Sequence, residues 1–232
     1  MTIAVILAGG LGTRLRSVVP DVPKPMAPIN GRPFLEHQIE YWLGQGVDRF
    51  ILSIGYKSNL ISDHFGNNYK GADIDYVVED NPLGTGGGLL LALEKVVDSK
   101  ALVLNGDTFF SVSLKQLCLT YADTQADCVF SLFRTMESDR YMGINLSKGG
   151  EITALTHEDT ARERIANGGV YLINTKAVKS LKLAENTKIS LESEIFSQMM
   201  NSGKKIFGHV FDEKFIDIGL PKDYLRAAKV LR

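Results

Sequence analysis

A short glycine-rich segment follows the first apolar run of the chain and could bind phosphate. The segment LAGGLGTRL occupies residues 7–15 and includes Thr13 and Arg14 near its end. Glycines let the backbone approach a phosphate and direct several N–H groups at it, and a guanidinium adds two parallel donors. A dinucleotide fingerprint, a P-loop and another phosphate cradle are the candidate sites, and a plain strand-to-helix turn is the structural alternative.

The residues of this segment fit neither of the two common nucleotide motifs. The dinucleotide fingerprint needs a third glycine where this chain has Leu15. The P-loop needs Gly-Lys followed by Ser or Thr, and the segment lacks it. We therefore expect a phosphate cradle of another kind, and a dehydrogenase is disfavoured.

A proline-rich segment comes next and contains a lysine. The segment PDVPKPMAPINGRP (residues 20–33) holds five of the seven prolines of the chain, and Lys24 lies between two of them. Prolines fix the backbone and reduce the entropy lost when a loop is ordered around a ligand. We expect Lys24 to stand beside the glycine segment and to neutralise phosphate charge there. A solvated surface lysine is the alternative.

Alternating patterns along the first half predict the elements that position these residues. Strand-like apolar runs are separated by helical patterns, with strands at 2–8, 49–55, 73–79 and 101–107 and helices at 33–46, 57–65, 87–97 and 113–123. This alternation is typical of a parallel sheet with helices on both faces. Ligands of such sheets bind at the carboxyl ends of the strands, which is where the glycine segment lies.

The second half has a different pattern of apolar runs but continues the same fold. Short strand-like runs are followed by two helical segments, with strands at 127–134, 141–147, 152–158, 168–174 and 204–211 and helices at 190–203 and 221–232. No repeat or linker separates the halves. We predict one domain over residues 1–232, an α/β fold with a Rossmann-like, mixed and mostly parallel sheet flanked by helices.

Composition excludes several classes of partner. The chain has 26 Lys and Arg against 27 Asp and Glu, so it lacks the basic excess of a nucleic-acid binder. No apolar run approaches the length of a membrane span, and no leader pattern opens the chain. Cys118 and Cys128 do not form a metal or disulfide pattern. We expect a cytoplasmic protein with no nucleic-acid or membrane partner.

Six segments in order resemble the sugar-1-phosphate nucleotidylyltransferase family. They are LAGGLGTRL with the following PKPM, VEDNPLGTGG (78–87), LNGD (104–107), RYMG (140–143), NGGVY (167–171) and FIDIGLPKDY (215–224). The resemblance covers nearly the whole chain. It implies the nucleotide-diphospho-sugar transferase fold and a reaction that joins a nucleoside triphosphate to a sugar 1-phosphate and releases pyrophosphate.

The resemblance implies that residues 1–125 mainly bind the nucleotide and that 126–232 mainly bind the sugar phosphate. Arg14 would hold the triphosphate tail and Lys24 the α-phosphate. Asp107 and Asp217 would hold Mg²⁺, which is commonly bound by one or two carboxylates together with substrate phosphates. Arg14, Lys24 and Asp107 are the implied catalytic residues. The nucleotide-binding set is Leu7, Ala8, Gly9, Gly10, Gly12, Thr13, Arg14, Lys24, Glu79, Gly84 and Thr85.

The choice of nucleotide is expected to depend on Glu79. In the family this region faces the base. A carboxylate only accepts hydrogen bonds, and guanine offers two adjacent donors, whereas uracil and thymine offer one donor between acceptors. Glu79 therefore favours GTP. An exposed acid at a glycine-rich helix start is the alternative.

The acceptor side is expected to lie around two further glycine segments. The implied sugar-phosphate-binding set is Asn105, Gly106, Gly143, Asn167, Gly168, Gly169, Glu192, Arg162 and Arg164. Many relatives carry a Glu-Lys pair before the NGG segment, whose lysine grips the sugar phosphate. This chain instead reads THEDTARER over 156–164, so Arg162 or Arg164 is expected to replace the lysine.

The short form of the family that this chain resembles is the bacterial D-glycero-α-D-manno-heptose 1-phosphate guanylyltransferases, which make GDP-heptose for surface glycans. Mannose 1-phosphate as acceptor, or a hexose or N-acetylmuramate 1-phosphate with UTP, are the alternatives within the family. A non-catalytic nucleotide-sugar sensor is the alternative of another class. The expected partners are GTP or another nucleoside triphosphate and a sugar 1-phosphate, with homo-oligomerisation left open.

Overall fold

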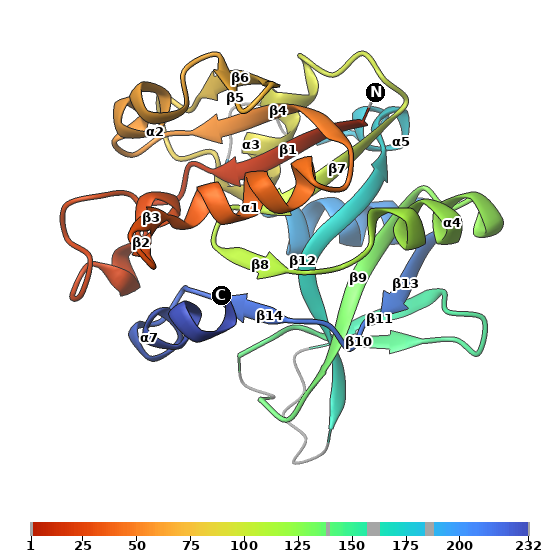
Figure 1. The fold of residues 1–232 in the computed structure, drawn as a ribbon. Coiled ribbons are helices and arrows are strands. Elements are labelled where there is room, and N and C mark those ends of the chain that lie inside the picture. The colour runs from red at the N-terminus through yellow and green to blue at the C-terminus, as the bar shows by residue number, and fades with distance from the viewer. Residues whose placement is uncertain (1, 138–139, 157–162, 184–187, 232) are drawn as a thin grey trace.

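A ten-stranded mixed sheet runs through the whole molecule in the computed structural model, which describes residues 2–137, 140–156, 163–183 and 188–231 (Figure 1). The order along the sheet is β11-β10-β12-β7-β1-β4-β6-β5, and β9 lies between β12 and β13 off this path. The sheet therefore joins the two halves of the sequence. The predicted α/β fold with a mixed sheet is confirmed.

The parallel core of the sheet comes from the first half. It consists of β1 (Thr2–Ala8), β4 (Val47–Ile54), β6 (Ala72–Val78) and β7 (Lys100–Asn105), close to the predicted ranges. These strands pair in parallel in the order β7-β1-β4-β6. Strands β1, β4 and β7 are largely buried because helices cover both faces of this part of the sheet. Their carboxyl ends meet at one edge.

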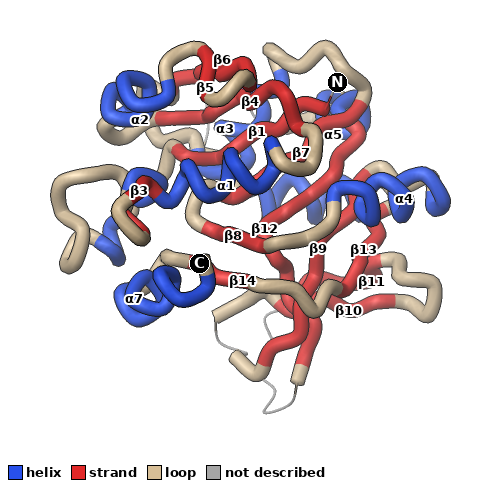
Figure 2. Tube along the Cα trace, in the orientation of Figure 1, coloured by secondary structure: helices blue, strands red, loops and turns tan. Residues whose placement is uncertain are grey.

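Alternate residues of β1 face two separate hydrophobic clusters. Ala4 and Ile6 pack with α1 (Phe34–Leu43), α2 (Ser58–Phe65) and α4 (Leu114–Thr124), whereas Ile3 and Val5 pack with the helices on the other face. Those helices are α3 (Gly84–Leu93), α5 (Thr175–Lys179), the π-helical turn η3 (Leu191–Phe196) and α6 (Ser197–Asn201). Figure 2 shows helices on both sides of the strands.

The second half adds mostly antiparallel strands. They are β9 (Cys128–Thr135), β10 (Gly143–Leu146), β11 (Ile152–Thr156), β12 (Arg164–Asn174) and β13 (Ile206–Val210). Strand β12 begins earlier than the predicted 168–174, because its first residues pair with β9 before an irregularity between Asn167 and Tyr171. It then pairs with β7 and so fuses the two halves.

Short elements form an additional layer beside the sheet. Strand β8 (Thr108–Phe110) pairs with β14 (Phe215–Asp217), and the C-terminal helix α7 (Pro221–Val230) follows β14. The proline segment contributes the turn η2 (Lys24–Met26) and the hairpin of β2 (Pro28–Ile29) and β3 (Arg32–Pro33). Strand β5 (Asn68–Tyr69) is the edge strand of the main sheet next to β6.

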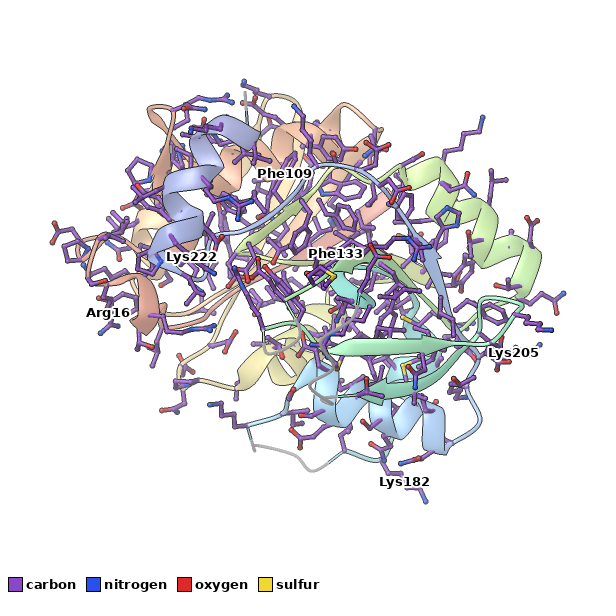
Figure 3. All side chains as sticks on the ribbon, turned by 90° about the horizontal axis from the view of Figure 1, so that it is seen from below. Arg16, Phe109, Phe133, Lys182, Lys205 and Lys222 are labelled. Carbon is purple, nitrogen blue, oxygen red and sulfur yellow. The ribbon has the colours of Figure 1, made fainter. Side chains whose placement is uncertain are left out.

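Aromatic rings join this layer to the sheet. Phe133 of β9 stacks on Phe215 of β14 with ring centroids 4.0 Å apart, and both contact Tyr141 edge-on. Phe133 lies near the centre of the view from below, while Lys182 and Lys205 lie at the periphery (Figure 3).

Within the described residues, no helix has the length and apolarity needed to cross a membrane.

A polar network on α1 connects it to the edge of the sheet. Glu40 accepts hydrogen bonds from Arg32, Tyr69 and Lys70. Burial raises the pKa of Glu40, but the hydrogen bonds from Lys70, Arg32 and Tyr69 outweigh it and lower that pKa from 4.5 to about 2. The carboxylate therefore stabilises the folded chain above its ordinary pKa, and this stabilisation is lost as the pH falls through the folded value.

Glu40→Gln should lower the free energy of unfolding by about 1–2 kcal/mol at neutral pH, because charged hydrogen bonds are replaced by weaker ones. Urea unfolding at neutral pH and at successively lower pH should show this difference shrinking below the ordinary pKa of 4.5. Glu94→Gln, at an exposed acid that ends α3, is the control and should change little. A difference that stays constant from neutral pH down to acid would contradict this account.

Candidate active site

The glycine segment lines a cleft at the carboxyl end of β1. After the strand, Gly9–Gly12 lead into a short turn, η1 (Thr13–Leu15), rather than directly into a long helix. Gly12 has a φ of 60°, in the left-handed region that favours glycine. A Cβ at Gly9 would come within 2.2 Å of Glu79 Oε1. The turn therefore favours glycine at position 12, and Gly9 leaves room for the Glu79 carboxylate.

Lys24 reaches from the proline segment to the end of β7. Its Nζ lies 2.7 Å from Asp107 Oδ2, and the two side chains are 12% and 33% exposed. Lys24 begins the turn η2, which follows Pro23 in extended conformation and includes the buried Pro25. Prolines restrict the backbone on both sides of Lys24, and its ammonium lies beside an acid instead of in open solvent.

The two distant aspartates lie side by side because β8 and β14 pair. Thr108 is directly opposite Asp217 in this antiparallel pair, and Ile218 N donates a hydrogen bond to the Asp107 carbonyl oxygen at 2.9 Å. Burial and then the nearby Asp107 carboxylate raise the pKa of Asp217. Gly219 N and Arg140 Nη2 donate to the Asp217 carboxylate at 2.6 and 3.1 Å. The carboxylates thus form one acidic corner.

Glu79 is held from two directions at the side of the glycine segment. Its Oε1 accepts from the Ser53 hydroxyl at 2.9 Å, and its Oε2 accepts from Leu83 N at 3.0 Å. Each carboxylate oxygen can accept a second hydrogen bond. A Cβ at Gly88 would come 2.7 Å from Oε1. Glu79 therefore keeps a fixed orientation while retaining acceptor capacity toward a ligand.

The NGG segment is a bulge inside β12. Asn167 Oδ1 accepts from Gly169 N at 3.0 Å, and Asn167 Nδ2 donates to the Tyr171 hydroxyl at 2.7 Å. Gly169 has a φ of 72°, and a Cβ at Gly168 would come within 2.5 Å of the Phe110 ring. The glycines let the strand bulge without a clash, and the bulge presents its backbone to the cleft.

Glu192 ties the two halves of the site together. Thr85 at the start of α3 donates its hydroxyl to Glu192 Oε2 at 3.2 Å, and Leu191 N donates to the Thr85 hydroxyl at 2.9 Å. Gly86 N donates to the Ile189 carbonyl oxygen at 2.9 Å. The first turn of α3 is thus fixed against the segment that carries Glu192.

Three adjoining hollows form a continuous cleft. The first, of about 580 Å³, is lined by the glycine segment, Glu79, Thr85 and residues 188–190. The second, of about 210 Å³, shares Gly10, Gly12 and Thr85 with the first and adds Lys24 and Asp107. The third, of about 280 Å³, shares Asn105 and Asp107 with the second and is also lined by Arg14, Arg140, Asn167, Gly168, Gly169, Glu192 and Asp217.

The acidic corner suits a hard divalent cation shared with a ligand. Among the residues that the structure describes, no three His, Cys, Asp or Glu side chains form a closed metal site. Asp107 lines the second and third hollows and Asp217 lines the third, so both offer carboxylate oxygens to the cleft, with Lys24 and Arg140 paired to them. Two carboxylates open to a cleft fit Mg²⁺, which keeps water and substrate phosphates among its ligands.

Two predicted acceptor residues, Gly143 and Arg164, lie apart from the cleft lining. Gly143 pairs with Ala166 and Thr156 and comes just after Met142, which does line the third hollow. Arg164 donates to the Tyr141 carbonyl oxygen and is not among the residues that line this hollow. Arg162 lies outside the described residues. The predicted replacement of the lysine therefore stays a prediction.

Several residues that line the cleft were not predicted from the sequence. Arg140 and Tyr141 belong to the RYMG segment, of which only the glycine was singled out, so the charge of Arg140 was an available signal. Lys188, Ser190 and Glu194 line the first hollow from a stretch in which only Glu192 had been noticed. Their place depends on the contact between residue 189 and α3, which no local pattern indicates.

The chain is similar to known proteins over nearly its whole length. Residues 3–232 match the model of the Nucleotidyl transferase family. The D-glycero-alpha-D-manno-heptose 1-phosphate guanylyltransferase of Aneurinibacillus thermoaerophilus is 40% identical over 229 residues, which are 99% of this chain and 98% of that protein. The mannose-1-phosphate guanylyltransferase of Mycobacterium tuberculosis is 32% identical over 229 residues, 97% of this chain and 63% of that protein.

A solved structure gives the same result for the fold. The crystal structure of HddC from Yersinia pseudotuberculosis complexed with GMP-PN matches with a TM-score of 0.86 and 33% sequence identity, covering 100% of both chains. The resemblance that the six sequence segments indicated is thereby confirmed. This chain belongs to the nucleotidyl transferase family.

Proposed function

We propose that this chain transfers the guanylyl group of GTP to D-glycero-α-D-manno-heptose 1-phosphate and releases pyrophosphate. The observation that carries the proposal is the continuous cleft, in which the glycine segment and Glu79 lie at one end, the NGG bulge at the other, and Lys24, Asp107 and Asp217 at the junction. The near full-length similarity to a heptose 1-phosphate guanylyltransferase supports this acceptor over mannose 1-phosphate, whose enzyme is less similar and longer.

The proposed reaction is an in-line displacement at the α-phosphorus. A phosphate oxygen of the sugar 1-phosphate forms the new bond, the bond from the α-phosphorus to the bridging oxygen of the β-phosphate breaks, and pyrophosphate leaves with that electron pair. Lys24 would neutralise the α-phosphate region and Arg14 the triphosphate tail. Catalysis would come from aligning two polyanions and stabilising the charge of the transition state, so no protein nucleophile is needed.

Asp107 and Asp217 would hold Mg²⁺ in this proposal. When bound, the cation would offset negative charge on the phosphate oxygens that react. The two carboxylates would supply hard oxygen ligands, and Lys24 and Arg140 are each paired with one of them. The cytoplasmic location, the nucleotide and acceptor halves (1–125 and 126–232) and a homo-oligomeric assembly stay predictions.

A panel of substrates tests the proposal directly. GTP and UTP are each combined with heptose, mannose, glucose and N-acetylmuramate 1-phosphates, and pyrophosphate release is measured. GTP with the heptose should give the largest kcat/KM. A preference for mannose 1-phosphate, or for UTP with another sugar, would replace the proposal with one of its alternatives. Absence of turnover with every pair, together with tight binding of a nucleotide sugar, would favour a sensor.

Asp107→Asn should lower kcat by about 10²–10³-fold or more, because a charge that stabilises the reacting phosphates is lost. The measurement is pyrophosphate release at saturating GTP, sugar phosphate and magnesium. Asp123→Asn, at an exposed acid of α4, removes the same charge away from the cleft and should leave kcat unchanged. An Asp107→Asn enzyme within about tenfold of the parent rate would contradict the role of this carboxylate.

Glu79→Gln should reduce the preference for GTP over UTP by about 1–3 kcal/mol, because an amide cannot accept two hydrogen bonds side by side. The ratio of kcat/KM for the two nucleotides is the readout. Glu94→Gln makes the same change at an exposed acid outside the cleft lining and should leave the nucleotide ratio unchanged. An unchanged ratio in Glu79→Gln would contradict the proposed recognition of guanine by Glu79.

A further inference from the structure

Asp223 is a buried acid that the proposed reaction does not use. It lies in the first turn of α7 and is 1% exposed, outside the lining of the three hollows. A carboxylate buried to this extent requires charged or hydrogen-bonding partners. Arg140 Nη1 donates to its Oδ2, and Arg226 Nη1 donates to its Oδ1 at 3.1 Å. Only the first of these partners continues toward the cleft.

Arg140 connects Asp223 to the acidic corner. Its Nη2 donates to Asp217 Oδ2 and to the Asp217 carbonyl oxygen, both at 3.1 Å. The side chain is 11% exposed, and its guanidinium carbon lies 4.8 Å from the centre of the Tyr141 ring. Its Nη1 also lies 3.5 Å from Glu137 Oε2. The two terminal nitrogens carry four N–H groups, and the four acceptors named here account for them.

This use of its donors makes Arg140 a positioning residue more than a phosphate ligand. The planar guanidinium is held at one end by Asp223 and presents its other end to Asp217 in fixed geometry. Asp217 Oδ1 is meanwhile held by Gly219 N at 2.6 Å. Both oxygens of the carboxylate beside Asp107 are thus oriented, one by backbone and one by Arg140.

We propose that Arg140 and Asp223 form a positioning pair that orients Asp217 for the divalent cation and so couples the C-terminal helix to the acidic corner. This inference rests on the proposed function. Asp223 compensates the charge of Arg140, which leaves Asp217 available to a cation. Without Asp223, the guanidinium of Arg140 would form its main ion pair with Asp217. It would then compete with the cation for that carboxylate.

The experiment measures cation affinity as well as rate. Binding of Mn²⁺ to the full chain saturated with a non-hydrolysable GTP analogue is followed by electron paramagnetic resonance, and the magnesium concentration for half-maximal rate is measured separately. Asp223→Asn should weaken Mn²⁺ binding about 10–100-fold and raise the half-saturating magnesium concentration similarly, because acids that orient metal ligands have effects of this size. The KM of GTP at saturating magnesium should change little, and high magnesium should restore much of kcat.

Arg226→Gln is the matched control. It removes the other cation bound to Asp223, and its own side chain is 63% exposed. It should leave Mn²⁺ affinity within about twofold of the parent chain, well inside the change expected when a ligand-orienting group is removed. Arg140→Lys is the second variant, since a single ammonium cannot bridge two acids as the planar fork does, and it should weaken the cation as Asp223→Asn does.

Thermal unfolding establishes that each variant is folded before it is compared. Unchanged Mn²⁺ affinity in a folded Asp223→Asn or Arg140→Lys chain would overturn the proposal, and so would failure of both variants to fold, since the pair would then be a determinant of folding only. The proposed function fails separately, if the parent chain turns over no sugar 1-phosphate or if Asp107→Asn remains active.

Discussion

The pairing of two three-residue strands is the constraint on which the site depends. Strands β8 and β14 place Thr108 opposite Asp217, and the hydrogen bond from Ile218 N to the Asp107 carbonyl oxygen fixes that register. A slip of one residue would turn the Asp217 side chain to the other face of the pair. The acidic corner therefore depends on a few backbone hydrogen bonds. The stacking of Phe215 on Phe133 supports the same pairing.

Bringing two acids together requires cations that are fixed by other elements. Lys24 is held by the proline segment and Arg140 by the buried Asp223, so each acid of the corner has a partner that approaches from a separate part of the fold. Burial and the charge of Asp107 both disfavour the ionised form of Asp217. The hydrogen bonds from Gly219 and Arg140 favour that ionised form. A divalent cation entering with a polyphosphate would meet carboxylates that are already oriented.

The features that depend on local patterns were predictable from the sequence. The parallel strands, the helices between them and the cap of α4, where Ser113 accepts from Gln116 N, follow from periodicity and short-range chemistry. Strands β8 and β14 are too short to carry a period, and Arg140 acquires its role only through contacts with residues far along the chain. The bulge in β12 was likewise hidden, because NGG is equally compatible with a hairpin turn. Tertiary pairing, not local preference, decided these features.

Some charged side chains of the cleft are paired within the protein, and others are available to a ligand. Lys24 and Arg140 are committed to acids of the fold, whereas Arg14 and Lys188 make no hydrogen bond or ion pair with another described residue through their side chains. Arg14 lines the hollow of the NGG bulge and Lys188 the hollow of Glu79. A polyanion bound along the cleft would therefore meet the uncommitted Lys188 in the hollow of Glu79 and the uncommitted Arg14 in the hollow that Asp107 and Asp217 line. Such a distribution attracts two phosphate-bearing ligands without leaving a buried charge unpartnered in their absence.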